Sequence, residues 1–219
     1  YVKILKQGNF LSYFGNSFII AMSTTVISIV LGSLAAYGLA IMKSNWGNRI
    51  STFLLFSKLV PTITIMIPLY IILDKVHLLG TYVGPILAHV SVNAPFVAWL
   101  VLGFIRDIPG DLFEAGKLDG CTRMQVFWKI VFPLLSPAIG SALLLVMQYS
   151  WNELLFSMQY TNLHTYTLTV GVSRFVGAIS VDWGQSSAAA TIVMVPIIIA
   201  GFFLQKYLVS GLTAGAVKG

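Results

Sequence analysis

Five long apolar stretches constrain the fold of this chain more than any other feature, because charged residues rarely interrupt them. A helix that crosses a lipid bilayer needs about 20 mostly apolar residues, and each stretch reaches that length. They cover residues 18–42, 50–73, 83–105, 137–158 and 188–209. All are too long for strands and lack sustained strand alternation, so a membrane barrel is not expected. The sequence predicts an all-α, polytopic membrane bundle with five visible spans.

Composition supports this prediction and excludes other classes of protein. Only 9% of the residues are charged and 57% are hydrophobic, against about 25% charged in ordinary soluble domains. The net charge of +6 does not predict nucleic-acid binding, because the basic residues are scattered and lie mostly at span ends. Cys121 is the only cysteine, so no intrachain disulfide forms. The three histidines are far apart in sequence, and we expect no metal site from them.

The basic residues also predict the orientation of the spans, since loops that face the cytoplasm carry an excess of Lys and Arg. If the first span ends inside, eight basic residues lie inside and four outside, with Lys58 within a span and uncounted. The loop 106–136 and the chain end are then cytoplasmic, and segments 1–17, 74–82 and 159–187 are external. An external start without a signal sequence leads us to expect one further helix upstream, six spans in all.

Proline, glycine and small residues indicate how the spans pack. Pro61 and Pro68 each remove a backbone hydrogen bond and should kink the second span. Asn93 and Pro95 suggest a second polar break in the third span. The small residues of 32–38 and 186–190 predict close helix packing, within the chain or against another subunit.

Several polar side chains lie at membrane depth, where such groups are costly and are functional candidates. Lys58 either extends its ammonium to the headgroups or has a buried partner or cavity-facing role. The candidates for lining a solute path are Asn93, Tyr149, Trp151, Asn152 and Glu153. Aromatic faces and amides suit a polyhydroxylated ligand, but membrane helices also use polar side chains as contacts between helices. Both interpretations stay open. The external segment 159–187 is either an aromatic cap or a docking site for an external partner.

The loop 106–136 holds a polar segment that the bilayer does not explain. It predicts one helix from Pro109 to Leu118, a break at Gly120 and a second helix over 123–131. Val126, Phe127, Ile130 and Val131 fall largely on one face of that second helix. An amphipathic helix lying on lipid is the simplest alternative. The angled break, and acids beside the bases, favour a protein-docking surface instead.

No catalytic or nucleotide-binding motif occurs in the sequence, so we expect a protein that is not itself an enzyme. If ATP drives its function, another chain binds the nucleotide. Two alternatives remain: an intramembrane enzyme using Ser57 and Lys58 or the histidines, and an assembly subunit that transports nothing. Adjacent residues on a helix point about 100° apart, which argues against the enzyme.

The loop resembles the EAA loop of importer permeases of the ABC (ATP-binding-cassette) class. Glu114-Ala115-Gly116, then Asp119-Gly120, and Phe127, Ile130 and Pro133 carry this resemblance, with Gly116 and Phe132 where Ala and Leu are usual. Asn16-Ser17, Trp151-Asn152-Glu153, Asp182-Trp183-Gly184 and the chain end are similar to the carbohydrate-importer subfamily, close to the maltose-type second permease. The resemblance covers nearly the whole chain, as a single transmembrane domain over residues 1–219, and such permeases usually have six spans.

The resemblance implies a permease in the cytoplasmic membrane of a bacterium, importing sugars or oligosaccharides. Its implied partners are a second, non-identical permease, two ATPase subunits that hold ATP and Mg²⁺, an extracytoplasmic solute-binding protein and lipid. The residues implied to contact the ATPase are Glu114, Ala115, Gly116, Asp119, Gly120, Arg123, Phe127 and Pro133. The tail 211–219, with Thr213 and Lys218, is implied to dock between the ATPase subunits.

Overall fold

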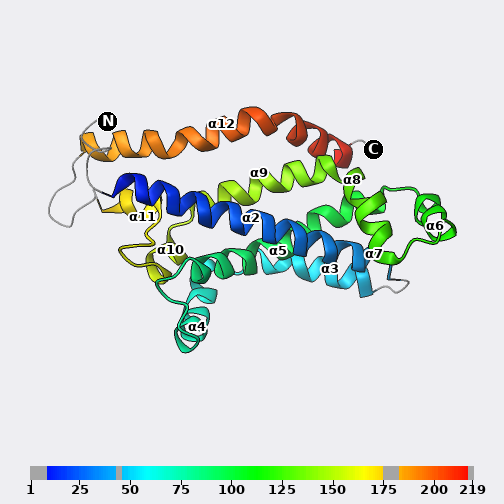
Figure 1. Ribbon diagram of the computed structural model, residues 1–219, viewed down its shortest axis with the longest axis horizontal. Helices are drawn as coiled ribbons and strands as arrows, with labels where there is room; N and C mark the ends of the chain where they lie inside the picture. Colours follow the sequence, from blue (N-terminus) through cyan, green and yellow to red (C-terminus); the bar gives the residue numbers. More distant parts are fainter. Residues whose placement is uncertain (1–8, 43–45, 175–182, 217–219) are drawn as a thin grey trace. The chain divides into compact units, whose positions relative to one another are not determined.

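The structure is a computed structural model that describes residues 9–42, 46–174 and 183–216, and all elements in these ranges are helices (Figure 1). The elements are α2 (Phe10–Ala40), α3 (Trp46–Ser57), α4 (Thr62–Lys75), α5 (Val83–Arg106), α6 (Gly110–Leu118), α7 (Arg123–Val126), the π-helical turn η1 (Phe127–Val131), α8 (Phe132–Leu134), α9 (Ser136–Asn152), α10 (Leu155–Tyr160), α11 (Leu168–Ser173) and α12 (Trp183–Ala216). The predicted all-α class is confirmed.

The chain divides into two compact units. The first unit contains Tyr1–Thr25, Val60–Ser91 and Val146–Phe203. The second unit contains Val26–Leu59, Val92–Leu145 and Leu204–Gly219. Helices α2, α5, α9 and α12 contribute residues to both units.

The predicted spans correspond to helices, with changes at their ends. Helices α2, α5 and the described part of α12 up to Phe203 are each long and apolar enough to cross a membrane. Two more spans result if α3 with α4, and the 123–134 helices with α9, each count as one broken span. The third predicted span matches α5 within one residue.

Three sequence predictions about helix interruptions need correction. The second span is not one kinked helix, because α3 ends at Ser57 and α4 begins only after Pro61, its N-cap. The fourth span, predicted to reach residue 158, ends at Asn152. Conversely, Pro95 does not interrupt α5, which continues to Arg106. A proline removes one backbone donor but lets a membrane helix continue where its neighbours compensate.

The core of the first unit is built around Trp151 of α9. Its side chain is 1% exposed, and its indole Nε1 donates to the carbonyl of Val193 on α12 at 3.0 Å. Phe14 of α2 meets it edge-on, with ring centroids 5.5 Å apart. Ala189 of α12 is buried in the same cluster, so one of the small residues predicted to pack closely does so within the chain.

Asn16 fixes the segment between α10 and α11 in the first unit. Its amide donates to the carbonyls of His164 and Tyr166 at 2.9 and 3.0 Å, and its Oδ1 accepts from the Tyr82 hydroxyl at 2.8 Å. Ser17 Oγ accepts from the backbone N–H of Leu168 at 2.7 Å. These bonds satisfy backbone groups of a turn that no helix supplies. They leave open whether this segment is an aromatic cap or a docking site.

In the second unit, α2 and α5 approach closely at Gly32. A Cβ atom at this position would lie 2.6 Å from Val97 Cβ and 3.0 Å from the Ala94 carbonyl. The neighbouring Ser33 and Ala36 are fully buried. Glycine is therefore required at Gly32 for backbone contact, as the small residues of this span predicted.

Candidate coupling site

Helix α6 ends in a Schellman motif centred on Gly120. The N–H of Gly120 donates to the Lys117 carbonyl and that of Cys121 to the Gly116 carbonyl, each at 3.0 Å. Gly120 has φ of 76°, in the left-handed region that side chains with a Cβ disfavour. The predicted break at Gly120 is confirmed, and its cause is the glycine.

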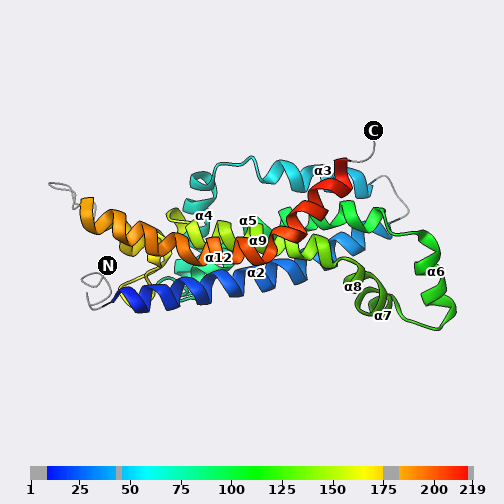
Figure 2. The same ribbon diagram turned by 90° about the horizontal axis from the view of Figure 1, so that it is seen from above.

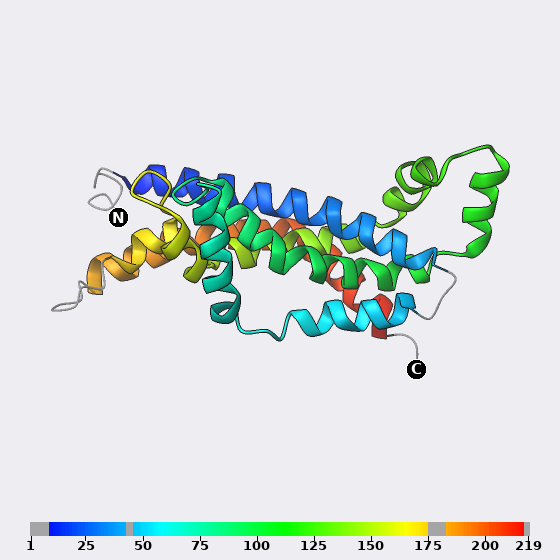
Figure 3. The same cartoon turned by 90° about the horizontal axis from the view of Figure 1, so that it is seen from below.

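A capping box starts the next helix two residues later. Thr122 Oγ1 accepts from the Gln125 backbone N–H at 3.3 Å, and Gln125 Oε1 accepts from the Thr122 N–H at 2.8 Å. Helix α7 continues through η1 into α8, which ends at Leu134. Figures 2 and 3 show α6 and α7 as separate helices joined by the short 119–122 segment. We call residues 110–134 the knuckle.

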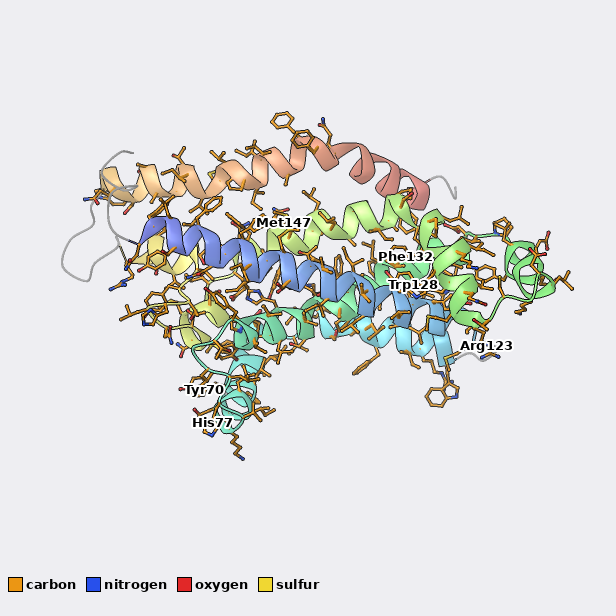
Figure 4. The ribbon with its side chains drawn as sticks, viewed as in Figure 1. Tyr70, His77, Arg123, Trp128, Phe132 and Met147 are labelled. Carbon is orange, nitrogen blue, oxygen red and sulfur yellow. The ribbon has the colours of Figure 1, made fainter. Side chains whose placement is uncertain are left out.

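The residues predicted to contact the ATPase divide into an exposed set and a buried set. Gly116 and Phe127 are buried inside the knuckle. The exposed members are Glu114, Ala115, Asp119, Gly120, Arg123 and Pro133. Arg123 lies at the start of α7 (Figure 4). The exposed set offers charges of both signs to a partner, while the buried set holds the helices together.

Leu118 completes the exposed face, and sequence reasoning missed it. Its side chain is 88% exposed, more than any other described large apolar side chain, and it stands at the last helical position of α6. Met124, at the start of α7, is also exposed. Two exposed apolar side chains that flank the Gly120 break beside charged ones have the composition of an interface, and a contact role for Leu118 is a prediction. Its position directly before Asp119-Gly120 was the available signal.

Gly116 is the contact point between α6 and the second helix. A Cβ there would lie 2.7 Å from Ile130 Cδ1 and 3.1 Å from Val126 Cγ2. Val126, Phe127 and Val131 are buried, which confirms the predicted apolar face of the second helix. The glycine thus lets the two helices of the knuckle pack closely.

Tyr37 of α2 connects the first span to both helices of the knuckle. Its ring stacks on Phe113 of α6 at 6.4 Å between centroids and lies 5.2 Å from the ring of Phe127. Its hydroxyl donates to the Arg123 carbonyl at 3.0 Å. Sequence reasoning treated this stretch only as a packing surface, because the partners of Tyr37 lie 76 or more residues away. Its ring among small residues was the only signal.

An aromatic cluster supports the base of the knuckle. The Phe127 and Trp128 rings meet edge-on at 4.8 Å, and Trp128 lies 4.9 Å from Phe132. Figure 4 shows Trp128 and Phe132 next to each other. Phe132, which stands where Leu is usual, therefore takes part in the packing of the knuckle.

Three of the candidate path residues make specific contacts inside the first unit. Glu153 Oε2 lies 3.1 Å from His89 Nε2, and its carboxylate accepts from the backbone N–H groups of Phe156 and Ser157 at 2.9 and 3.1 Å. Trp151 belongs to the core described above. The ring of Tyr149 lies edge-on to His89 at 6.2 Å. Such contacts are what helix-to-helix packing requires, so a role of these residues in the path stays a prediction.

Asn152 is the exposed member of the candidate path residues. Its amide donates to the Gln148 carbonyl one turn earlier at 2.9 Å, and both side chains are exposed on α9. An exposed Asn and Gln on one helical face of a membrane span suit a water-filled path better than lipid. Asn152 is therefore the best-placed candidate of this set for meeting a solute.

Lys58 lies in the break after α3, and the structure identifies a partner. Its Nζ donates to Asn93 Oδ1 at 3.2 Å and lies 5.1 Å from the centre of the Phe96 ring, all within the second unit. Of the two interpretations left open, this contact supports the partnered lysine. The adjacent Ser57 donates its hydroxyl to the Leu54 carbonyl at 2.7 Å instead.

Two further predictions concern the chain end and metals. Helix α12 continues through Ala216, so Thr213 lies in a helix, whereas Lys218 lies outside the described residues. The docking role of the tail stays a prediction.

Among the described residues, no group of three His, Cys, Asp or Glu side chains is arranged to hold a metal ion.

Residues 28–214 match the family described as "Binding-protein-dependent transport system inner membrane component". The chain belongs to this family. It is 34% identical over 223 residues to the trehalose/maltose transport system permease protein MalG of Thermococcus litoralis, covering 100% of this chain and 80% of that protein. It is also 34% identical to the trehalose transport system permease protein SugB of Mycobacterium tuberculosis, covering 100% and 81%.

Comparison with solved structures supports the same fold. A bacterial ABC transporter involved in import of the acidic polysaccharide alginate matches with a TM-score of 0.79 at 21% identity, over 94% of this chain and 78% of that chain. The family model and the curated relatives identify the protein as a multi-pass membrane permease subunit rather than an enzyme. Its family supports the transport interpretation and neither of the two alternatives.

Proposed function

We propose that this permease forms half of the translocation path of an ATP-driven, binding-protein-dependent sugar importer in a bacterial cytoplasmic membrane. A second, non-identical permease supplies the other half. Two ATPase subunits hold ATP and Mg²⁺, and an extracytoplasmic solute-binding protein delivers the cargo. The observation that carries this proposal is the knuckle, whose polar and apolar side chains point outward from a rigid two-helix unit.

The knuckle suits an ATPase surface groove by its chemistry. Leu118 supplies an exposed apolar anchor, and Glu114 and Asp119 are exposed carboxylates on the same short helix and its C-cap. An apolar anchor with a polar rim is the usual composition of a binding hot spot. In this proposal, Leu118 enters the groove while the two carboxylates set its orientation.

A movement of the ATPase would be transmitted to the membrane spans by the side-chain contacts inside the knuckle and between the knuckle and α2. Gly116 and Phe127 make α6 and the second helix one body, and Tyr37 joins that body to α2. Closure of the two ATPase subunits on ATP would rock the knuckle and, with it, the cytoplasmic end of the first span. The path would then alternate between inward-facing and outward-facing states.

The cargo assignment rests on the names of relatives. These include permeases for trehalose and maltose, for melibiose, raffinose and stachyose, and for arabinooligosaccharides. The exposed amides of Gln148 and Asn152 suit sugar hydroxyls. We therefore propose a disaccharide or oligosaccharide as the solute, with Asn152 as the first residue of this chain to test for contact.

Two substitutions test whether the knuckle couples the permease to the ATPase: one reverses the charge of Glu114, and the other removes the apolar side chain of Leu118. Glu114→Lys and Leu118→Asp should each weaken ATPase binding by about 2 kcal/mol, roughly thirtyfold, and should abolish coupled uptake. Uptake and ATPase activity are measured in vesicles with the co-purified subunits. Lys75→Gln, which removes an exposed charge from α4 outside the knuckle, is the matched control and should transport normally. Normal coupled transport by both test variants would overturn the assignment.

A ligand screen tests the cargo. The binding protein that co-purifies with this permease should be stabilised against heat by a disaccharide or oligosaccharide and not by amino acids or metal ions. Stabilisation by a non-sugar would remove the cargo assignment and leave the coupling role in place.

A further inference from the structure

A cavity of about 460 Å³ lies beneath the knuckle, within the second unit. The end of α2, the end of α5, α6 and the start of α7 surround it. Its walls are apolar, with Ile41, Ile105 and Phe113 among them, and three cationic side chains line it: Arg106, Lys117 and Arg123. Glu114 is the single carboxylate of its lining, so the lining carries two positive charges in excess. Its volume is typical of a small-molecule site.

The level of the cavity is that of lipid headgroups. It lies where the α2 and α5 spans end, on the side that the Lys and Arg distribution places in the cytoplasm. Arg106 Nη2 donates to Asn48 Oδ1 at 2.6 Å, which joins the cavity rim to the start of α3. There, Trp46 is exposed and the Arg49 guanidinium lies 5.4 Å from the centre of its ring. Exposed Trp beside Arg marks the membrane interface.

We propose that this cavity binds the phosphate headgroup of an anionic phospholipid of the cytoplasmic leaflet. Basic pockets between membrane helices on the cytoplasmic side have the chemistry for such headgroups. The cations meet the phosphodiester. The apolar walls, with the exposed side chains of Ile41 and Met42 at the end of α2, meet the first carbons of the lipid.

Glu114 selects among anions. A carboxylate in the lining repels a free phosphate dianion, but it accepts hydrogen bonds from the hydroxyls of a glycerol headgroup. Phosphatidylglycerol therefore fits the lining better than inorganic phosphate does. Bound there, the lipid would connect α6 to the ends of α2 and α5 and would restrict movement of the knuckle relative to these helices.

Lipid retention by the purified complex tests the proposal. Native mass spectrometry measures binding of dioleoyl phosphatidylglycerol, with phosphatidylcholine as the neutral comparison. Wild type should prefer phosphatidylglycerol. Arg106→Gln and Lys117→Gln should each weaken its binding about fivefold, which corresponds to about 1 kcal/mol per cation, and the double variant about 25-fold. Lys129→Gln, an equal charge change outside the cavity, should change nothing.

Two further measurements separate the alternatives. Ala40→Trp fills the cavity without removing a charge and should also reduce phosphatidylglycerol binding, whereas millimolar inorganic phosphate should not displace the lipid. Equal losses in the Lys129→Gln control, no effect of Ala40→Trp, or displacement by free phosphate would each overturn the proposal. Because the readout is lipid retention, a complex that fails to import sugar would contradict the proposed function and leave this test unaffected.

Discussion

Two of the breaks between helices, at Gly120 and at Glu153, are held in opposite ways. At Gly120, backbone hydrogen bonds and a capping box close the break within ten residues, and the charged side chains stay exposed. At Glu153, between α9 and α10, a buried carboxylate closes the break, and its partner His89 lies 64 residues earlier in the chain. The Gly120 break is closed by hydrogen bonds within its own segment, and its charged side chains remain available to a partner. The Glu153 break depends on a distant residue of its unit, His89, and its carboxylate is engaged inside that unit.

This difference indicates which of the two breaks can keep its local structure while the neighbouring helices move. A locally closed break keeps its shape when the helices around it shift, because the hydrogen bonds that close it all join residues between Gly116 and Gln125. A break closed by distant residues loses buried hydrogen bonds if its surroundings shift. The knuckle therefore suits a moving contact, and the Glu153 break suits a fixed point. The following substitutions test this contrast.

The largest effect is expected at the Glu153 break. His89→Leu leaves the buried Glu153 carboxylate without its imidazole partner and should lower the free energy of unfolding by about 3 kcal/mol. Thermal unfolding in detergent measures the loss. The control is His164→Leu, since the side chain of His164 is exposed; it should leave the midpoint unchanged. A wild-type midpoint for His89→Leu would show that the pair does not hold this break.

Replacing the glycine of the knuckle should have a smaller effect on stability but a direct one on coupling. Gly120→Val places a β-branched residue at φ of 76° and should cost about 2 kcal/mol. We expect α6 to tilt and coupled uptake to fall, with the membrane spans intact. Gly103→Val on α5 is the matched control, because a Cβ there meets nothing within 4 Å and its φ is ordinary. Equal behaviour of the two variants would refute a special role for Gly120.

The sequence predicted the breaks that local residues determine better than those that depend on distant residues. The break at Gly120 was predictable because a glycine between two short helical stretches is a local signal, whereas the capping box of Thr122 and Gln125, equally local, was not predicted. The apolar spans were readable for the same reason, since periodicity and composition are local. Pro61 predicted a distortion in the right place, but its size, a complete break, depends on packing.

The contacts that sequence reasoning missed all join residues far apart in the chain. His89 with Glu153, Asn16 with the 161–167 turn, and Tyr37 with the knuckle each bring together different helices. Hydrophobic periodicity gives the face of a helix but not the residue that faces it. For that reason the sequence did not show that Trp151 packs in a core or that Glu153 contacts His89, and the role of both residues in the path stays a prediction.

The contact between the knuckle and α2 should depend on one hydrogen bond from Tyr37 and on the packing of its ring. Tyr37→Phe removes the hydroxyl that donates to the Arg123 carbonyl and should cost about 1 kcal/mol. The ring contacts with Phe113 and Phe127 remain, so we expect reduced uptake per ATP hydrolysed rather than loss of assembly. Coupling ratios in vesicles measure this. Tyr70→Phe on α4 (Figure 4) is the control in the other unit, and an equal drop in both variants would argue against a specific tie.

The smallest effect is expected for Gly116→Ala, which restores the alanine of the EAA pattern that this loop resembles. The added methyl of Gly116→Ala would meet the flexible end of Ile130, which can rotate away, and Val126 at a close but tolerable 3.1 Å. Alanine also gains about 1 kcal/mol of helix propensity over glycine, so the net change in stability should stay below about 1 kcal/mol with uptake kept.

Gly116→Val tests more strongly whether close packing at this position holds the two helices of the knuckle together. Its two extra methyl groups would have to displace Val126 as well as Ile130, and overpacking of this kind costs about 1–3 kcal/mol. We expect α6 to separate from the second helix and coupled uptake to fall, although the Gly120 break is unchanged. If Gly116→Val transports as well as Gly116→Ala, the two helices do not act as one body. The locally closed break at Gly120 would then hold the knuckle by itself.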